Sequence, residues 1–238
     1  MDFVSIILAN SRKGQGSETV ARLNYLTSSY GSSLLDLAFQ TYGSDYRTII
    51  ALPHEYDERA FGYRENKCVI FKKFTTATFG ALSTLGLLLN EIPPDLAILV
   101  TPVDGHVSSP IKEFVSQMHE GGYDAGVVIF ESTNPKFSYV RIHDGLAIEV
   151  AEKVRISTSA TAGIFYFRDK RTLIDCIKWA MLNDIQTNGQ FYIAPSLNYL
   201  ITQKRSIGIY EVNADQYYRF STIDEAKSSF DRMSHRGF

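Results

Sequence analysis

A glutamate and a lysine stand side by side at Glu152 and Lys153, where they interrupt an otherwise apolar alternation. A lysine ammonium provides positive charge for a phosphate, and a neighbouring carboxylate accepts hydrogen bonds from sugar hydroxyls. Small residues from Ser159 to Gly163 follow, and we expect them to form a turn into the strand-like run Ile164 to Phe167. The charged pair therefore predicts a pocket for a phosphorylated sugar at a strand end.

Asp104 is a second candidate, because it follows the apolar run Leu96 to Val100. Ligands of open α/β sheets bind at the carboxyl ends of strands, where a carboxylate can hold Mg²⁺ against nucleotide phosphates. Asp-Gly is also a common turn pair, so a turn aspartate is an equal alternative. His106 is a further candidate ligand at short spacing, although a lone histidine is more often a loop residue.

Two glycine-containing segments have the chemistry of nucleotide contacts. Thr78 is a good N-cap for the leucine-rich segment after it, and Gly80 would let a ligand approach the first helical turn. The polar residues from 10 to 17 offer backbone N–H groups to phosphates, with added charge from Arg12 and Lys13. Each signal is weak alone, since capping explains the first and an exposed loop the second.

Short apolar runs and amphipathic segments indicate how these residues are positioned. The apolar runs, typical of strands buried on both faces, are Val4 to Ala9, Thr48 to Leu52, Cys68 to Phe71, Leu96 to Val100 and Ala125 to Phe130. The amphipathic segments of helical length are Ser32 to Tyr42, Thr78 to Glu91 and Ile111 to His119. Strands that alternate with helices predict an α/β domain with a mainly parallel sheet.

From Asp124 the pattern becomes rich in strands, and it then returns to helices. The expected later elements are helices at Lys170 to Asn183 and Tyr192 to Thr202, a strand at Ile207 to Val212 and a helix at Thr222 to Met233. No Pro/Gly/Ser linker divides the chain. We therefore expect one domain over residues 1–233 and a tail over 234–238.

Composition excludes several classes of protein. The formal net charge of −2 implies no broad basic field for nucleic acid. The two cysteines, Cys68 and Cys176, match no zinc or redox spacing, and free thiols are expected of a cytoplasmic protein. The apolar run from Phe3 to Ala9 is too short to span a membrane and does not form a signal peptide, so neither is expected.

These segments occur in an order that resembles the sugar nucleotidyltransferase family, with its glycosyltransferase-A-type, Rossmann-like mixed sheet flanked by helices. The segment Thr78-x-Gly80 with Thr84 resembles the family's base-binding motif, and Asp104 falls at its first metal-binding aspartate. The sugar-side matches are Pro135 to Val140, Glu152-Lys153 and Ala160 to Phe167. Residues 188–195 resemble a segment that normally has glutamate at the position of Gln190.

The resemblance implies a set of roles. The implied catalytic residues are Asp104, Arg12 and Lys13; the nucleotide-binding residues are Leu8, Ala9, Asn10, Ser11, Gly14, Thr78 and Gly80; the substrate-binding residues are Tyr139, Glu152, Lys153 and Gly163. Asp104 is also the implied ligand of Mg²⁺ or Mn²⁺. The implied partners are a nucleoside triphosphate and a phosphorylated sugar or similar metabolite, with homo-oligomer formation left open.

The sequence departs from the family on the side that activates phosphate. The glycine-rich loop aligns either at residues 10–14 or at 14–18, and in the second register Glu18 replaces an arginine. Asn24 falls near a lysine of the family, and Arg219 falls near its second metal-binding aspartate. An arginine has no acceptor and cannot ligate Mg²⁺. Arg12, Lys13 and Arg22 are candidate replacements, and Arg219 is a candidate fixed charge in place of a metal.

Three hypotheses follow. We favour a nucleotidyltransferase that makes nucleotide-activated sugars for surface or capsule polysaccharide. The altered residues Asn24 and Arg219 instead favour a regulatory homologue that binds ligands without catalysis. A glycosyltransferase with Asp104 and His106 as a metal pair is the third, and the match at Glu152-Lys153 argues against it.

Overall fold

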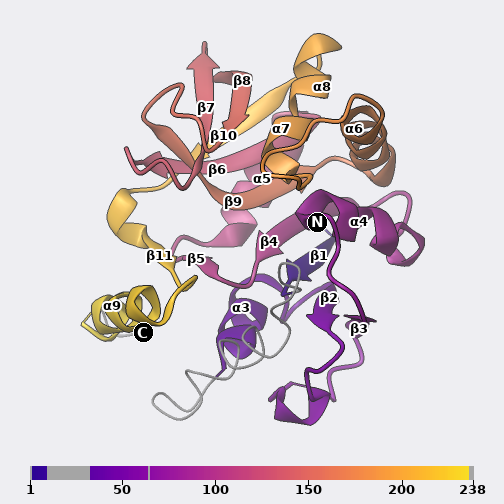
Figure 1. Cartoon of the computed structure of the whole chain (residues 1–238), viewed down its shortest axis with the longest axis vertical. Helices are drawn as coiled ribbons and strands as arrows, with labels where there is room; N and C mark the ends of the chain where they lie inside the picture. Colours follow the sequence, from indigo (N-terminus) through magenta and orange to yellow (C-terminus); the bar gives the residue numbers. More distant parts are fainter. Residues whose placement is uncertain (1, 10–32, 64, 236–238) are drawn as a thin grey trace.

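The computed structural model describes residues 2–9, 33–63 and 65–235, and within them nine strands form one central sheet (Figure 1). In spatial order the strands are β3 (Val69–Phe74), β2 (Arg47–Pro53), β1 (Phe3–Leu8), β4 (Ala97–Pro102), β9 (Ser159–Phe167), β6 (Ala125–Glu131), β10 (Ile207–Glu211), β8 (Leu146–Glu152) and β7 (Ser138–His143). The predicted apolar runs therefore all form strands.

The sheet is mixed, as the resemblance implied. Strand β1 pairs in parallel with β2 and β4, and β2 pairs in parallel with β3. Strand β9 lies between β4 and β6 and is antiparallel to both. It follows the β7–β8 hairpin and enters the sheet from the opposite direction, so the expectation of a mainly parallel sheet holds for one half only.

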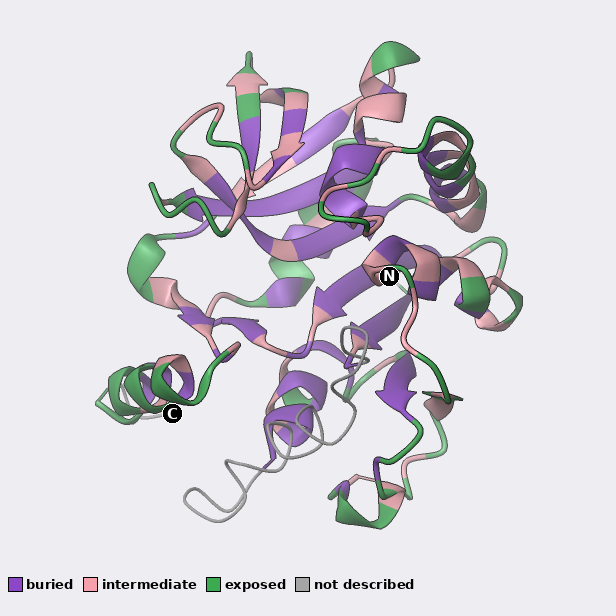
Figure 2. Ribbon diagram, viewed as in Figure 1, coloured by how far each residue is buried: buried purple, intermediate pink, exposed green. Residues whose placement is uncertain are grey.

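Helices cover both faces of the sheet and create two apolar cores. On one face lie α3 (Leu34–Tyr42) and α5 (Ile111–Glu120), and α9 (Ile223–Ser234) joins the same core. On the other lie α4 (Ala81–Leu88), α6 (Lys170–Leu182), α7 (Ile193–Ser196) and α8 (Asn198–Thr202). Figure 2 shows the central strands almost fully buried between these layers. Burial on both faces explains why the strands are nearly continuous apolar runs.

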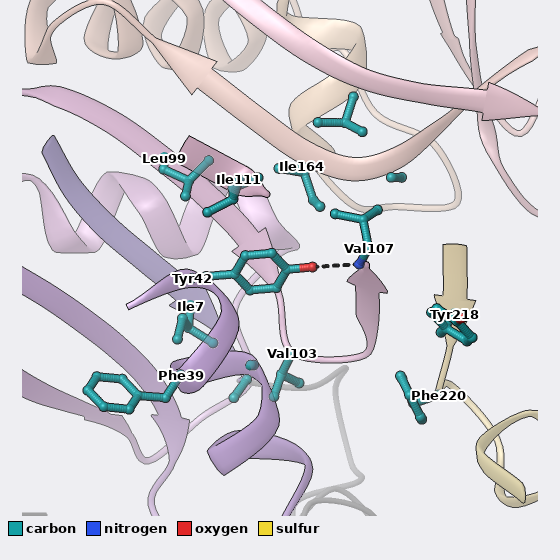
Figure 3. Packing of buried hydrophobic residues seen from close by; sticks show 14 of the residues in the cluster. Ile7, Phe39, Tyr42, Leu99, Val103, Val107, Ile111, Ile164, Tyr218 and Phe220 are labelled. Carbon is teal, nitrogen blue, oxygen red and sulfur yellow. Dashed lines mark hydrogen bonds between the residues drawn. The ribbon is translucent and has the colours of Figure 1, made fainter. Parts of the chain in front are cut away.

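A small second sheet supports the segment after β4. Its strands β5 (Gly105–Val107) and β11 (Tyr217–Arg219) are antiparallel, with Arg219 opposite Gly105. The buried hydroxyl of Tyr42 donates to the Gly105 carbonyl (3.1 Å) and accepts from the Val107 N–H (3.0 Å; Figure 3). Helix α3 thereby fixes β5 and, with it, the position of Asp104.

Two local predictions were wrong. Residues 159–163 do not form a turn but belong to β9, where Ala160 pairs with Phe130. A bulge in this pairing accompanies the positive φ of +77° at Gly163, a conformation that favours glycine. The helix expected at Tyr192 to Thr202 is split into α7 and α8.

The remaining connections are short. Single 3₁₀ turns lie at Glu58–Ala60, Leu89–Glu91 and Ala214–Gln216. Among the described residues, no helix is both long and apolar enough to cross a membrane. The division into a domain of residues 1–233 and a tail stays a prediction; helix α9 itself ends at Ser234.

Candidate functional site

A cavity of about 1040 Å³ opens at the carboxyl ends of β1 and β4. Small-molecule sites commonly have volumes of roughly 300 to 1,000 Å³. The predicted site residues that line it are Leu8, Ala9, Thr78, Gly80, Asp104, Glu152, Lys153 and Gly163. The predicted residues Asn10, Ser11, Arg12, Lys13 and Gly14 lie outside the described part of the chain. Segments far apart in sequence therefore meet at the strand ends, where sequence reasoning expected a ligand.

One side of this cavity, here called the sugar wall, consists of Ser138, Glu152, Lys153 and Tyr192. Ser138 and Glu152 face each other across the β7–β8 hairpin, and the serine hydroxyl donates to the Glu152 carboxylate. Glu152 is only 8% exposed. A buried carboxylate needs such donors, and its orientation is fixed by them.

Lys153 follows β8 with a φ of +56°. A left-handed conformation at a residue other than glycine costs on the order of 1 kcal/mol or more, and such strain collects at functional sites. Its N–H donates to the Phe137 carbonyl (3.1 Å). Its Nζ donates to the Tyr192 hydroxyl (2.7 Å) and lies 4.6 Å from the centre of that ring. The ammonium is thus held against Tyr192 at the cavity wall.

Tyr139 does not line the cavity with its predicted partners. It is fully buried, and its hydroxyl donates to the Asn134 carbonyl (2.7 Å). The side chain of Asn134 accepts from the N–H of Lys136 (3.1 Å), and Lys136 and Phe137 line the cavity. Tyr139 therefore supports the loop that contacts the cavity.

Thr78, Gly80 and Thr84 form the side of the cavity where a nucleotide was expected. The prediction of Thr78 as an N-cap was wrong: Gly80 precedes α4, without a side-chain cap. Thr78 and Thr84 instead share a hydrogen bond of 2.7 Å between their hydroxyls. Gly80 has a φ of +111°, and a Cβ there would lie 2.5 Å from the Phe191 carbonyl oxygen. Glycine is required because the chain at Phe191 packs directly against the start of α4.

A second part of the cavity lining, here called the phosphate wall, consists of Asp104, Arg219, Ser221 and Glu225. Ser221 Oγ donates to Asp104 Oδ2 (2.8 Å) and accepts from Arg219 Nε (3.0 Å). Arg219 Nε also lies 3.5 Å from Glu225 Oε2, and its Cζ lies 5.1 Å from the centre of the Phe137 ring. The guanidinium is therefore coupled to the predicted catalytic aspartate through one serine.

Burial shapes the protonation of two side chains near Asp104. Burial, with a further contribution from the negative charge of Asp104, raises the pKa of Tyr217, so its phenol at the cavity stays neutral. Burial lowers the pKa of His106 to about 4. His106 is not a cavity residue; its Nδ1 lies 3.1 Å from Thr41 Oγ1, and Tyr42 and Tyr218 flank its ring. This arrangement is that of a core histidine rather than of a metal ligand beside Asp104.

The residues present do not fit a Mg²⁺ site held by two carboxylates. Within the described ranges, no group of three or more His, Cys, Asp or Glu side chains is arranged to hold a metal ion. At the cavity, Arg219 lies where the resemblance places the second carboxylate, and a guanidinium has no acceptor atom. The interpretation of Asp104 as a ligand of Mg²⁺ or Mn²⁺ stays a prediction.

Sequence reasoning missed several polar partners of the predicted residues. Ser138 was detectable in principle, because a hairpin with Tyr139 and Ala147 on facing strands pairs it with Glu152. Ser221 and Glu225 were not, because their place beside Asp104 depends on the pairing of β11 with β5. Tyr192 was expected only as the start of a helix, and its contact with Lys153 joins residues 39 positions apart.

The backbone of this chain is similar to the backbones of several solved structures. No family model matches the chain, and no curated protein matches its sequence. Among solved structures, the nucleoside-diphosphate-sugar pyrophosphorylase from Vibrio cholerae RC9 has a TM-score of 0.74 at 18% identity, over 95% of this chain and 99% of that one. A candidate glucose-1-phosphate thymidylyltransferase from Bacillus anthracis, in complex with a sucrose, has a TM-score of 0.70 at 18% identity, over 99% and 96%.

A third similar structure is HddC from Yersinia pseudotuberculosis complexed with GMP-PN. Its TM-score is 0.65 at 13% identity, and the match covers 97% of this chain and 99% of that one. Since all these identities are low, the likeness concerns the path of the backbone. The chain has the α/β fold of nucleotidyltransferases, with a mixed central sheet flanked by helices.

Proposed function

We propose that the cavity binds a nucleoside triphosphate and a sugar phosphate, or a similar small phosphorylated metabolite, and joins the nucleotide to it. One observation carries this proposal: Glu152 and Lys153 line the same cavity as Asp104 and the Thr78–Gly80 segment. The fold supports it, because proteins described as a nucleotide-sugar pyrophosphorylase and a thymidylyltransferase share the backbone arrangement.

The reaction is an in-line displacement at phosphorus. An oxygen of the sugar phosphate attacks the α-phosphorus of the triphosphate, and the bond from that phosphorus to the departing pyrophosphate breaks. Lys153 binds the sugar phosphate and Glu152 accepts from sugar hydroxyls, while Thr78 and Gly80 lie against the nucleotide. Arg12 and Lys13, outside the described residues, are the proposed cations for the leaving group. The product would supply surface polysaccharide synthesis.

The test is pyrophosphate release. The protein is incubated with each of ATP, GTP, CTP, UTP and dTTP in Mg²⁺ buffer, against a panel of sugar 1-phosphates and small phosphorylated alcohols. One pair should release pyrophosphate and form the nucleotide-linked product in equal amounts. The Lys153→Ala protein lacks the proposed cation for the sugar phosphate, so it should release pyrophosphate from that pair at a lower rate. Absence of release with every pair would reject the enzymatic proposal.

A ligand-binding protein without turnover is the second candidate, and the arginine at position 219 favours it. Calorimetry would then detect binding of a nucleotide or sugar phosphate, with no product over hours. Turnover that Asp104→Ala abolishes would eliminate this candidate. The glycosyltransferase alternative is weakened because His106 lies in the core and not at the cavity.

A further inference from the structure

Arg219 presents a fixed cation at the cavity. It ends β11, directly opposite Gly105 of β5, and its side chain is 25% exposed. Its backbone is held from both sides by Ser229, whose hydroxyl accepts from the Arg219 N–H (3.1 Å) and donates to its carbonyl (2.7 Å). The main chain beneath this guanidinium is thus anchored to helix α9.

The guanidinium itself is restrained at three points but not saturated. Nε donates to Ser221, the Glu225 carboxylate lies 3.5 Å from Nε without a hydrogen bond, and the Phe137 ring lies against Cζ. Among the described residues, the buried Nη1 has no hydrogen-bond partner, and neither does the buried Oε2 of Glu225. The Arg219 side chain as a whole is 25% exposed and lines the cavity, so an anionic oxygen can approach the guanidinium from that side and add to its few acceptors.

The neighbours of Arg219 also explain its relation to Asp104. Because Ser221 donates to Asp104 and accepts from Arg219, one carboxylate oxygen is already engaged with a group coupled to a cation. Two carboxylates facing each other would repel, unless a metal ion or a shared proton lay between them. One carboxylate and one guanidinium balance each other in charge without a metal ion.

We propose that Arg219 directly binds the diphosphate group of the ligand, and that this contact requires no divalent cation. The inference rests on the proposed function, since it assumes a diphosphate-containing ligand in this cavity. A guanidinium is suited to the role because its planar fork of N–H groups matches two phosphate oxygens at once. Lys153 on the sugar wall lines the same cavity and offers a second cation to an anionic ligand.

The test uses inorganic pyrophosphate, the smallest diphosphate and one that is independent of base and sugar. Its affinity is measured by calorimetry on the full chain, once in EDTA and once in Mg²⁺. The wild type should bind in EDTA, and Arg219→Ala should weaken that binding by about 10- to 100-fold. Arg219→Lys keeps the positive charge but loses the planar fork of N–H groups. Its pyrophosphate affinity should therefore lie between those of the wild type and Arg219→Ala. Thermal unfolding establishes that each variant is folded.

Arg232→Ala is the matched control. Arg232 also lies over an aromatic ring of β11, with its Cζ 4.8 Å from the centre of Tyr218, but it is exposed and does not line the cavity. Its loss should leave pyrophosphate affinity within about twofold. Equal affinities of the Arg219→Ala and Arg232→Ala proteins would overturn the inference, and so would loss of wild-type binding in EDTA.

The same proteins separate this inference from the proposed function. Arg219-dependent pyrophosphate binding without turnover on any substrate pair would retain the inference and remove the enzymatic activity. Turnover together with pyrophosphate binding that Arg219→Ala leaves unchanged would retain the enzymatic activity and reject the inference.

Discussion

The sugar wall and the phosphate wall face one cavity but differ in how far they match the resemblance. Glu152 and Lys153, for which the resemblance implied a substrate-binding role, line the cavity on the sugar wall. On the phosphate side, Asp104 faces an arginine where a second carboxylate was implied. One wall thus has a carboxylate with an ammonium, and the other has carboxylates with a guanidinium. Mutations on each wall test whether the two have separate roles.

The largest expected effect is on the sugar wall. Lys153→Ala removes the cation proposed for the sugar phosphate, so kcat/KM for that substrate should fall by about 100-fold, as for other charged groups that contact a reacting phosphate. Steady-state kinetics with the accepted substrate pair measure this. Lys178→Ala, at an exposed lysine of α6, is the control and should leave the rate unchanged. A similar small effect of both substitutions would show that the sugar wall is structural only.

The next prediction concerns His106 of β5, the strand that follows Asp104. Its burial should make the free energy of unfolding depend on pH. In the folded protein the pKa of His106 is about 4, whereas an unfolded histidine has a pKa of about 6.5. The unfolded chain therefore binds more protons as pH falls, and stability should be full above about pH 7 and decline from pH 6.5 to 4. The expected loss is about 3 kcal/mol from this residue.

Urea denaturation at a series of pH values between 7.5 and 4 measures that loss. The wild type should be compared with the His106→Gln protein, whose side chain at this position cannot titrate. The difference in unfolding free energy between the two proteins should change with pH over this window. Parallel pH profiles would mean that His106 is not desolvated in the folded state. Burial raises the pKa of the flanking Tyr42, so this ring stays neutral throughout the comparison.

The two walls also differ in how well sequence predicted them. The strands β1, β2, β4 and β6 were visible because burial on both faces makes them continuous apolar runs. Glu152 and Lys153 were recognisable as a charged pair because they interrupt an otherwise apolar alternation at a strand end. Ser221 reaches Asp104 across 117 positions of sequence, through a pairing of two three-residue strands that no periodicity reveals.

The wrong local predictions have physical reasons as well. The small residues from Ser159 to Gly163 have turn chemistry, but tertiary pairing with β6 holds them in an extended strand. Thr78 has good capping chemistry, yet its hydroxyl is engaged by Thr84 and the close packing at Phe191 begins the helix at Gly80. In both cases contacts with distant segments overrode a local preference.

A smaller effect is expected at Tyr42, which holds β5 below Asp104. Tyr42→Phe leaves the Gly105 carbonyl and Val107 N–H without their buried partner, so the free energy of unfolding should fall by about 1 to 3 kcal/mol. Tyr218→Phe is the control, because the buried Tyr218 hydroxyl has no hydrogen-bond partner among the described residues. Its removal should be nearly neutral or stabilising. Equal losses from both substitutions in urea denaturation would contradict the role given to Tyr42.

The smallest effect returns to the sugar wall. Tyr192→Phe removes the acceptor for Lys153 Nζ but keeps the ring beside the ammonium. Because one partly buried hydrogen bond contributes about 1 kcal/mol, KM for the sugar phosphate should rise by about 3- to 5-fold with little change in kcat. Tyr199→Phe on α8 is the control. A loss in kcat comparable to that of Lys153→Ala would mean that Tyr192 determines the position of the ammonium, and that the sugar wall acts as one coupled unit rather than as separate contacts.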